Sequence, residues 1–149
     1  MEVTVKSPAS SANLGPCFDC AGIAFPLYNF VNVKKTDNGQ IKVIIDEKND
    51  VRDFIVDEKN IIFQAFKRFH ERTNTENTGY EVRVETHIPI ARGLGSSASV
   101  IAGALIGANE LNGKPLSRQD LIDIAAGIGM LIIAALLFIL RKRDLIGIL

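Results

Sequence analysis

The feature that most constrains this sequence is a glycine- and serine-rich segment, Pro89–Ser99, that reads Pro-Ile-Ala-Arg-Gly-Leu-Gly-Ser-Ser-Ala-Ser. Before it, Tyr80–His87 alternates between uncharged and charged or polar side chains, a period of two that predicts a half-buried strand. After it, an apolar run predicts a helix from about Ser96 to Leu111, stopped by Asn-Gly-Lys-Pro at residues 112–115. The segment therefore carries the chain from a strand into the first turn of a helix.

This segment has the chemistry of a phosphate-binding loop. Glycines let the backbone approach a bulky anion, and the first helical turn offers unpaired N–H groups with a partial positive charge. It lacks the lysine of a Walker loop and the third glycine of a dinucleotide fingerprint. A tight turn that packs a helix on a sheet would explain the glycines, but not Gly-Leu-Gly-Ser-Ser-Ala as a unit. The sequence thus predicts a nucleoside triphosphate site. Its residues are Pro89, Ile90, Ala91, Arg92, Gly93, Leu94, Gly95, Ser96, Ser97, Ala98 and Ser99.

Charge and cysteine content exclude several classes of partner. The 149 residues include 17 basic and 17 acidic ones, so the formal net charge is zero and we expect no nucleic-acid partner. The start, Met-Glu-Val-Thr-Val-Lys, lacks the basic head and apolar run of a secretory signal, and we expect a cytoplasmic protein. Cys17 and Cys20 have the C-x-x-C spacing of a redox pair or of half a zinc site. A zinc site would need two more ligands, and two reduced thiols in a cytosolic loop are the preferred interpretation.

The N-terminal half predicts strands. Val3–Lys6 is expected to be a short strand that ends at a Ser-Pro pair, followed by a long loop over residues 8–22. The apolar runs Ile23–Lys35 and Ile41–Ile45 are expected to be two more strands. The Asp-Asn-Gly sequence between these runs is a strong hairpin signal. Residues 46–59 are charged and are expected to be irregular.

Two further helices are expected. Asn60 is expected to cap a helix whose apolar stripe ends near Thr73. Ser117-Arg-Gln-Asp120 resembles a capping box at the start of another helix. The mixed order of strands and helices predicts an α+β domain. We expect a mixed sheet with the helices of residues 60–73 and 96–111 on one face.

A second motif lies near the N-terminus, Pro8-Ala-Ser-Ser-Ala-Asn-Leu-Gly-Pro-Cys-Phe-Asp-Cys-Ala-Gly22. Together, the two motifs resemble the homoserine kinase family of the GHMP small-molecule kinases. The first motif of that family reads much like Pro-Ala-Ser-Ser-Ala-Asn-Leu-Gly-Pro-Gly-Phe-Asp. Mevalonate kinases and galactokinases carry a different first motif. The resemblance covers about residues 1–126 and implies an N-terminal-like ATP-binding domain of the GHMP type.

The resemblance implies roles for single residues. In the family the Pro89–Ser99 loop holds the phosphates of ATP, and Ser96 or Ser97 contacts Mg²⁺. Asn60 matches a position near the adenine. Taken without the family, Asn60 is a helix cap, and both roles are compatible.

The implied acceptor is homoserine, and two residues of the first motif match positions that contact it. They are Asn13 and Asp19, and a carboxylate such as Asp19 suits the ammonium group of an amino acid. Taken without the family, Asn13 can be a turn-forming amide and Asp19 a solvated acid. Cys17 stands where the family has glycine, which would cost about 1–2 kcal/mol if that position needs a positive φ.

The resemblance ends after Ala126. The family continues with an acidic segment whose Glu binds magnesium and then with a second domain. In this chain, an apolar run and then Arg141-Lys-Arg143 follow instead, so residues 127–149 are expected to be an apolar helix with a basic tail that does not match the family. Ile124–Leu140 is uncharged and at the short edge of the roughly 17–25 residues of a membrane-spanning helix. Three interpretations stay open. They are a single-pass membrane anchor, an apolar helix that is buried or drives self-association, and a truncated, fused or frame-shifted continuation.

The expected activity is transfer of the γ-phosphoryl group of ATP to the homoserine hydroxyl, giving O-phosphohomoserine for threonine biosynthesis. We expect it to be weak in this chain alone, because the second half of the family pattern is missing. Such transfers depend on positioning and charge neutralisation, so we assign no catalytic base. One alternative is a non-catalytic nucleotide-binding module, and another is an unstable, inactive fragment.

Overall fold

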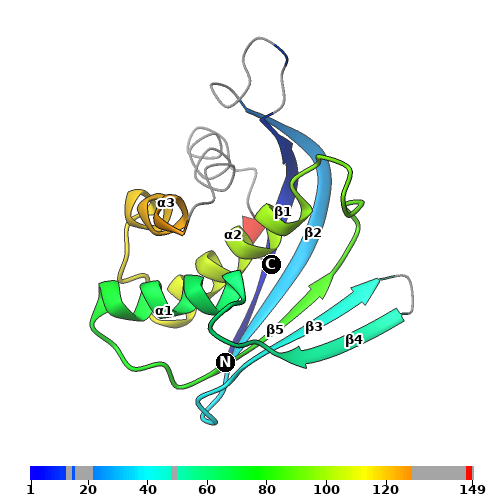
Figure 1. The fold of residues 1–149 in the computed structure, drawn as a ribbon. Helices are drawn as coiled ribbons and strands as arrows, with labels where there is room; N and C mark the ends of the chain where they lie inside the picture. Colours follow the sequence, from blue (N-terminus) through cyan, green and yellow to red (C-terminus); the bar gives the residue numbers. More distant parts are fainter. Residues whose placement is uncertain (13–14, 16–21, 48–49, 129–146, 149) are drawn as a thin grey trace.

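The described chain forms one mixed β-sheet with helices on one of its faces (Figure 1). The computed structural model describes residues 1–12, 15, 22–47, 50–128 and 147–148. The strands are β1 (Glu2–Ser11), β2 (Ile23–Lys35), β3 (Ile41–Glu47), β4 (Asp50–Ile55), β5 (Tyr80–Glu85) and β6 (Gly147–Ile148). The helices are α1 (Ile61–Thr73), α2 (Ser96–Leu111) and α3 (Arg118–Gly127). This arrangement confirms the predicted α+β class and its mixed sheet.

The strands lie in the order β4-β3-β5-β2-β1-β6. Neighbouring strands are antiparallel except β3 and β5, which run parallel. Because β5 follows α1 in the chain, the connection from β3 to β5 crosses the sheet through a helix, as parallel neighbours require. The short β6 pairs with β1 at Val5 and Lys6, a pairing that the sequence did not predict.

The predicted hairpin between β2 and β3 is wrong. The turn exists, with Gly39 in the left-handed region at φ 69°, but β5 lies between the two strands. The turn bonds to the segment before β5 instead, since Thr36 N donates to Gly79 O at 3.0 Å and Gly39 N donates to Thr78 O at 2.8 Å. A side chain at Gly79 would meet Thr36 Oγ1 at 2.6 Å, so this glycine permits the approach. Strand β5 therefore pairs with both β2 and β3, which do not pair with each other.

The structure also extends one predicted strand and adds one that was not predicted. β1 continues past Ser7-Pro8 to Ser11, and its register against β2 shifts between Pro8 and Ala9. Such an irregularity accommodates a proline, which has no N–H to donate. The segment expected to be irregular contains β4, which pairs with β3 at the edge of the sheet. Charged residues are common on edge strands, and because of them the sequence pattern did not predict β4.

The helix starts agree with the sequence. Asn60 caps α1, where its Oδ1 accepts a hydrogen bond from Ile62 N at 2.9 Å. Ser117 and Asp120 form a complete capping box at α3. Asp120 also pairs with Arg72 of α1 at 2.9 Å. The hydrogen bonds from Ser117 and then from Arg72 hold the pKa of the Asp120 carboxyl down to about 2.

The core lies between the sheet and the helices. Its fully buried members include Val31 and Val33 of β2, Val82 of β5, and Phe66 of α1. Phe66 stacks on the Tyr80 ring with centroids 4.3 Å apart. The opposite face of the sheet is polar, and its side-chain pairs include Asn32 with Thr4, Lys6 with Tyr28, and Lys42 with Asp53.

Most of the predicted C-terminal apolar helix lies outside the described residues. Of Ile124–Leu140, residues 124–127 belong to α3, which ends at Gly127. Among the residues that the structure describes, no helix combines the length and the apolar character needed to cross a membrane.

Helix α2 approaches β2 closely because two of its residues lack side chains. A Cβ at Gly103 would lie 2.7 Å from Val31 Cγ2, and one at Gly107 would lie 2.5 Å from Val33 Cγ2 and 2.9 Å from Val33 Cβ. Valine is branched at Cβ and cannot turn away cheaply.

We expect Gly107→Ala to lower the free energy of unfolding by about 1–3 kcal/mol, because the added methyl overpacks this contact. Urea denaturation measures the change. Gly127→Ala is the matched control, since among the described residues its methyl meets only the flexible tip of Arg68, and it should be neutral or stabilise by up to about 1 kcal/mol. Equal stability of both variants would contradict this account of the α2 packing.

A buried histidine makes the fold sensitive to acid. His70 is only 5% exposed, and its Nε2 has no hydrogen-bond partner within the described residues, while its Nδ1 lies 2.8 Å from Thr75 Oγ1. Burial, followed by the positive charge of Lys35, lowers the pKa of His70 below its ordinary value of 6.5. The unfolded chain therefore takes up this proton before the folded one does.

The contribution of neutral His70 to stability is complete above the unfolded pKa, about 6.5, and is lost as the pH falls below it. We expect the midpoint of urea denaturation to drop between pH 7.5 and pH 5.5, and to drop less in His70→Gln. The same pH dependence in both proteins would show that His70 does not carry the effect.

Candidate phosphate-binding site

The loop at residues 89–95, called the phosphate loop below, connects the end of β5 to α2. Its tip turns through the left-handed region three times, at Ala91 (φ 58°), Gly93 (φ 71°) and Gly95 (φ 66°). Among the residues that the structure describes, nothing lies within 4 Å of the position of a Cβ at Gly93. Gly95 is the N-cap of α2.

The first turn of α2 carries uncapped donors. Gly95 makes no side-chain cap hydrogen bond, and the first turn contains no acidic residue. Ser99 N, which donates to Gly95 O at 2.9 Å, makes the first bond of the helix, so the N–H groups of Ser96, Ser97 and Ala98 precede the helical ladder. Such a helix start binds anions through its N–H groups and its dipole.

The two sequence motifs meet at this loop. Ser10, in the first motif, donates from its N to Leu94 O at 3.0 Å. A Cβ at Gly95 would lie 2.6 Å from Ser10 Oγ and 2.9 Å from Ser10 O, so only glycine fits between the loop and β1. The end of β1, from which the rest of the first motif continues, therefore lies directly against the phosphate loop.

One residue of the site was missed by the sequence analysis. Asn29 of β2 is fully buried, and its Oδ1 accepts hydrogen bonds from both His87 N and Ile88 N at 2.9 Å. Its Nδ2 donates to Ser99 Oγ at 2.8 Å. The only signal in the sequence is that Asn29 is one of two asparagines in a largely apolar and aromatic stretch, which does not reveal its partners.

A cavity of about 180 Å³ opens beside the phosphate loop. Its polar lining comes from Asn60, Thr86, Ser96 and Ser97, and its apolar lining is Val43, Ile45, Ile61, Ile62, Val84, Ile90, Val100 and Ile101. The volume is below the roughly 300–1,000 Å³ of typical ligand pockets. The cavity therefore has room for one part of a ligand, with the remainder outside along the loop.

Four of the predicted site residues line this cavity, and the others lie elsewhere along the loop and the helix start. Asn60, Ile90, Ser96 and Ser97 share the cavity. Pro89, Ala91, Arg92 and Gly93 are exposed on the loop, while Leu94 is half-buried. Ala98 and Ser99 are buried, and the Ser99 hydroxyl is used internally, because it donates to Ser96 O at 2.7 Å and accepts from Asn29.

The residues predicted to contact the acceptor lie outside the described part of the chain. They are Asn13 and Asp19, and the Cys17–Cys20 pair lies there too. Within the described ranges no group of three or more His, Cys, Asp or Glu side chains could hold a metal ion.

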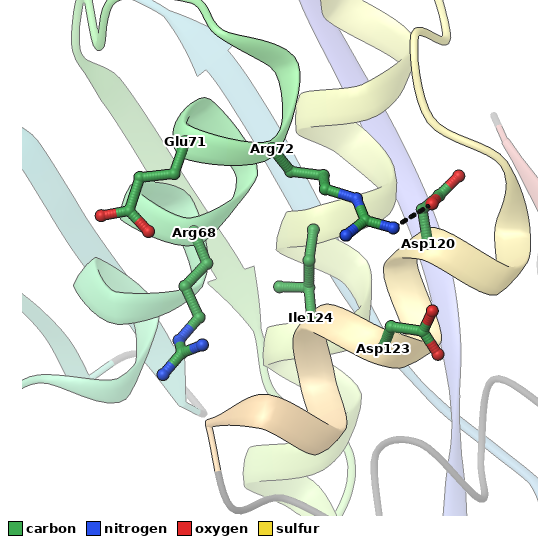
Figure 2. A pocket seen from close by; sticks show the side chains of 6 residues that line it. All are labelled: Arg68, Glu71, Arg72, Asp120, Asp123 and Ile124. Carbon is green, nitrogen blue, oxygen red and sulfur yellow. Dashed lines mark hydrogen bonds and ion pairs between the residues drawn. The ribbon is translucent and has the colours of Figure 1, made fainter.

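A second cavity lies between α1 and α3 and is lined by none of the loop residues (Figure 2). It has a volume of about 310 Å³ and is lined by Arg68, Glu71, Arg72, Asp120, Asp123 and Ile124. Figure 2 shows the Arg72–Asp120 ion pair bridging the two helices. Its charged lining combines two arginines with three acidic residues, so it is not a positively charged site for an anion.

Comparison with known proteins identifies the family of the chain. The sequence profile of the GHMP kinases N terminal domain matches residues 60–137. Homoserine kinase of Clostridium botulinum (strain Kyoto / Type A2) is 38% identical over 126 residues, covering 85% of this chain and 40% of that protein. Homoserine kinase of Petrotoga mobilis is 40% identical over 125 residues, with 83% and 40% covered. The chain thus spans about 40% of the length of these relatives.

Solved structures share the fold. A homoserine kinase from Cytophaga hutchinsonii superposes with a TM-score of 0.73 at 26% identity, covering 87% of this chain and 41% of that one. The Methanococcus jannaschii mevalonate kinase gives the same TM-score at 18% identity, covering 93% and 51%. At that identity the likeness to the mevalonate kinase concerns the fold alone.

Two glycines of the loop provide a test of its anchoring. Gly93 and Gly95 have similar left-handed φ angles, so alanine should cost about 1–2 kcal/mol of strain at either position. Only at Gly95 does the methyl also collide with Ser10. We therefore expect Gly95→Ala to lower the midpoint of urea denaturation clearly more than Gly93→Ala. Equal effects would mean that the contact with β1 does not hold the loop.

Proposed function

This chain belongs to the family of GHMP kinase N-terminal domains, and from that premise we propose that its phosphate loop binds the phosphates of ATP. We further propose that the bound ATP is the donor for phosphoryl transfer to the hydroxyl of a small amino acid, homoserine. The observation that carries the proposal is the uncapped start of α2 beside a partly apolar cavity, with the first motif in contact with the loop.

The proposed nucleotide orientation follows from the lining of the site. Apolar walls of β3, β5 and α1 suit the flat base, and Asn60 at the start of α1 suits its polar edge. The Oδ1 of Asn60 already accepts from Ile62 N, so its Nδ2 is the group left to contact the base. The phosphates would then lie along the first turn of α2, where Ser96 and Ser97 share the same cavity.

The residues fit a magnesium nucleotide. Backbone N–H groups stabilise the negative charge of the phosphates, and Ser97, which is exposed at the helix start, can offer its hydroxyl to Mg²⁺. When bound, the ion neutralises charge on the phosphates during transfer. The protein's part is to position the phosphates and to supply fixed donors.

The proposal for the acceptor rests on the relatives and the first motif. Asn13 and Asp19 follow Ser10 and Ser11 in the chain, and Ser10 lies against the phosphate loop. We propose that these two residues hold the acceptor, on the strength of the family resemblance of the first motif. The carboxylate of Asp19 is suited to the ammonium group of homoserine, and the amide of Asn13 can both donate and accept.

Thermal unfolding with and without magnesium ATP tests the nucleotide site. A ligand at about 100 times its Kd adds about 2.7 kcal/mol to stability. We expect a rise of several degrees in Tm with magnesium ATP, and a smaller rise in Ser97→Ala. Ser117→Ala is the matched control: it removes a serine at another helix start, so it should lower Tm but keep the full nucleotide-induced rise.

No rise in Tm with any magnesium nucleotide would refute the proposed site. Formation of phosphorylated homoserine in the same mixture, followed by mass spectrometry, separates phosphoryl transfer from nucleotide binding alone.

A further inference from the structure

We propose that Asn29 is the positioning residue of the phosphate loop, because its buried amide holds both ends of the loop at one point on β2. The role rests on the proposed function of the loop. The Asn29 hydrogen bonds join residues far apart in the sequence.

The two ends of the loop meet at this side chain. Oδ1 accepts from His87 N and Ile88 N, the last backbone groups before the loop. Nδ2 donates to Ser99 Oγ in the first turn of α2 and lies 3.5 Å from Ser96 Oγ. Because backbone N–H groups can bond only to the oxygen, these contacts also determine which way the amide points.

The hydrogen bonds continue to the helix start. Ser99 Oγ accepts from Asn29 and donates to Ser96 O at 2.7 Å. The Ser96 peptide is part of the turn that carries the anion-binding N–H groups. A shift of Asn29 would therefore move these donors relative to the strand end from which the loop leaves.

The location of Asn29 argues against a simple packing role. It shares a face of β2 with Val31 and Val33, which are fully buried under α2. A polar side chain at such a position costs free energy unless its hydrogen bonds are satisfied, and an apolar residue would pack without that requirement. Here both atoms of the amide are bonded, and all their partners flank the phosphate loop.

The test separates ligand positioning from general stability by comparing ligands with and without phosphate. Asn29→Leu keeps the size of the side chain and removes all its hydrogen bonds. Ser99→Ala removes only the link to the helix and provides a milder variant if the first one fails to fold. Asn32→Leu, the same change on the opposite face of β2, is the matched control. Calorimetry on folded protein would measure binding of magnesium ATP and tripolyphosphate, and ligand-observed NMR would measure adenosine.

We expect Asn29→Leu to weaken tripolyphosphate and ATP binding at least about tenfold, since small displacements of binding groups have large effects. Adenosine binding and the control variant should stay close to wild type. Asn29→Asp should restore no more than part of the affinity, because its carboxylate accepts from both N–H groups but bonds to Ser99 only by taking the hydroxyl proton away from Ser96 O. Unchanged tripolyphosphate affinity in Asn29→Leu and Ser99→Ala, or an equal loss for adenosine, would overturn the proposal.

A ligand-independent measurement keeps the two proposals distinct. If the wild-type chain binds neither nucleotide nor tripolyphosphate, the proposed function fails. Amide hydrogen exchange then decides the role of Asn29 by itself. Faster exchange at Ser10, whose N–H bonds to Leu94 O, and at Ser99, whose N–H bonds to Gly95 O, with no change at Gly39, supports positioning of the loop in Asn29→Leu, and unchanged exchange at both refutes it.

Discussion

Helix α2 can lie directly on strand β2 because Gly103 and Gly107 carry no side chains that would hold the two backbones apart. This contact determines where the helix begins relative to the sheet. The start of α2 comes to lie beside the end of β1 and the segment that follows β5. The donors of the first helical turn therefore have a defined position because of contacts two to three turns further along the same helix. The proposed anion site therefore depends on how the rest of the helix packs on the sheet.

Polar contacts then refine a position that apolar packing has set approximately. Ser10 bonds to Leu94 on one side of the loop, and Asn29 bonds to both of its ends on the other. Buried polar groups of this kind are costly when unpaired, so they favour one arrangement over close alternatives. In this fold they are placed where a loop without regular secondary structure must present backbone N–H groups in one orientation. The same loop made of glycine and serine alone would have many conformations of similar energy.

Local patterns were sufficient for much of the fold. The caps at Asn60 and Ser117, the alternation in β5 and the extent of α2 all depend on residues within one or two turns of each other. The hairpin prediction failed because Asn-Gly specifies a turn and leaves the partner of the following strand open. β4 was missed because an edge strand in contact with solvent can carry charges. The phosphate loop was predicted as a unit, yet the burial of Ser99 and its bond to Asn29 were not.

The sequence by itself determined the chemistry of the loop, because glycine, serine and a helix start bring their donors and their conformational freedom to any fold that contains them. It also determined the family, through two motifs that are specific as whole segments. Only the tertiary structure decided that these motifs touch at Ser10 and Gly95, that β5 separates β2 from β3, and that Asn29 joins both ends of the loop. The physical reason is that such contacts join residues distant in the chain, and their partners are selected by the packing of the whole core, which no local pattern records.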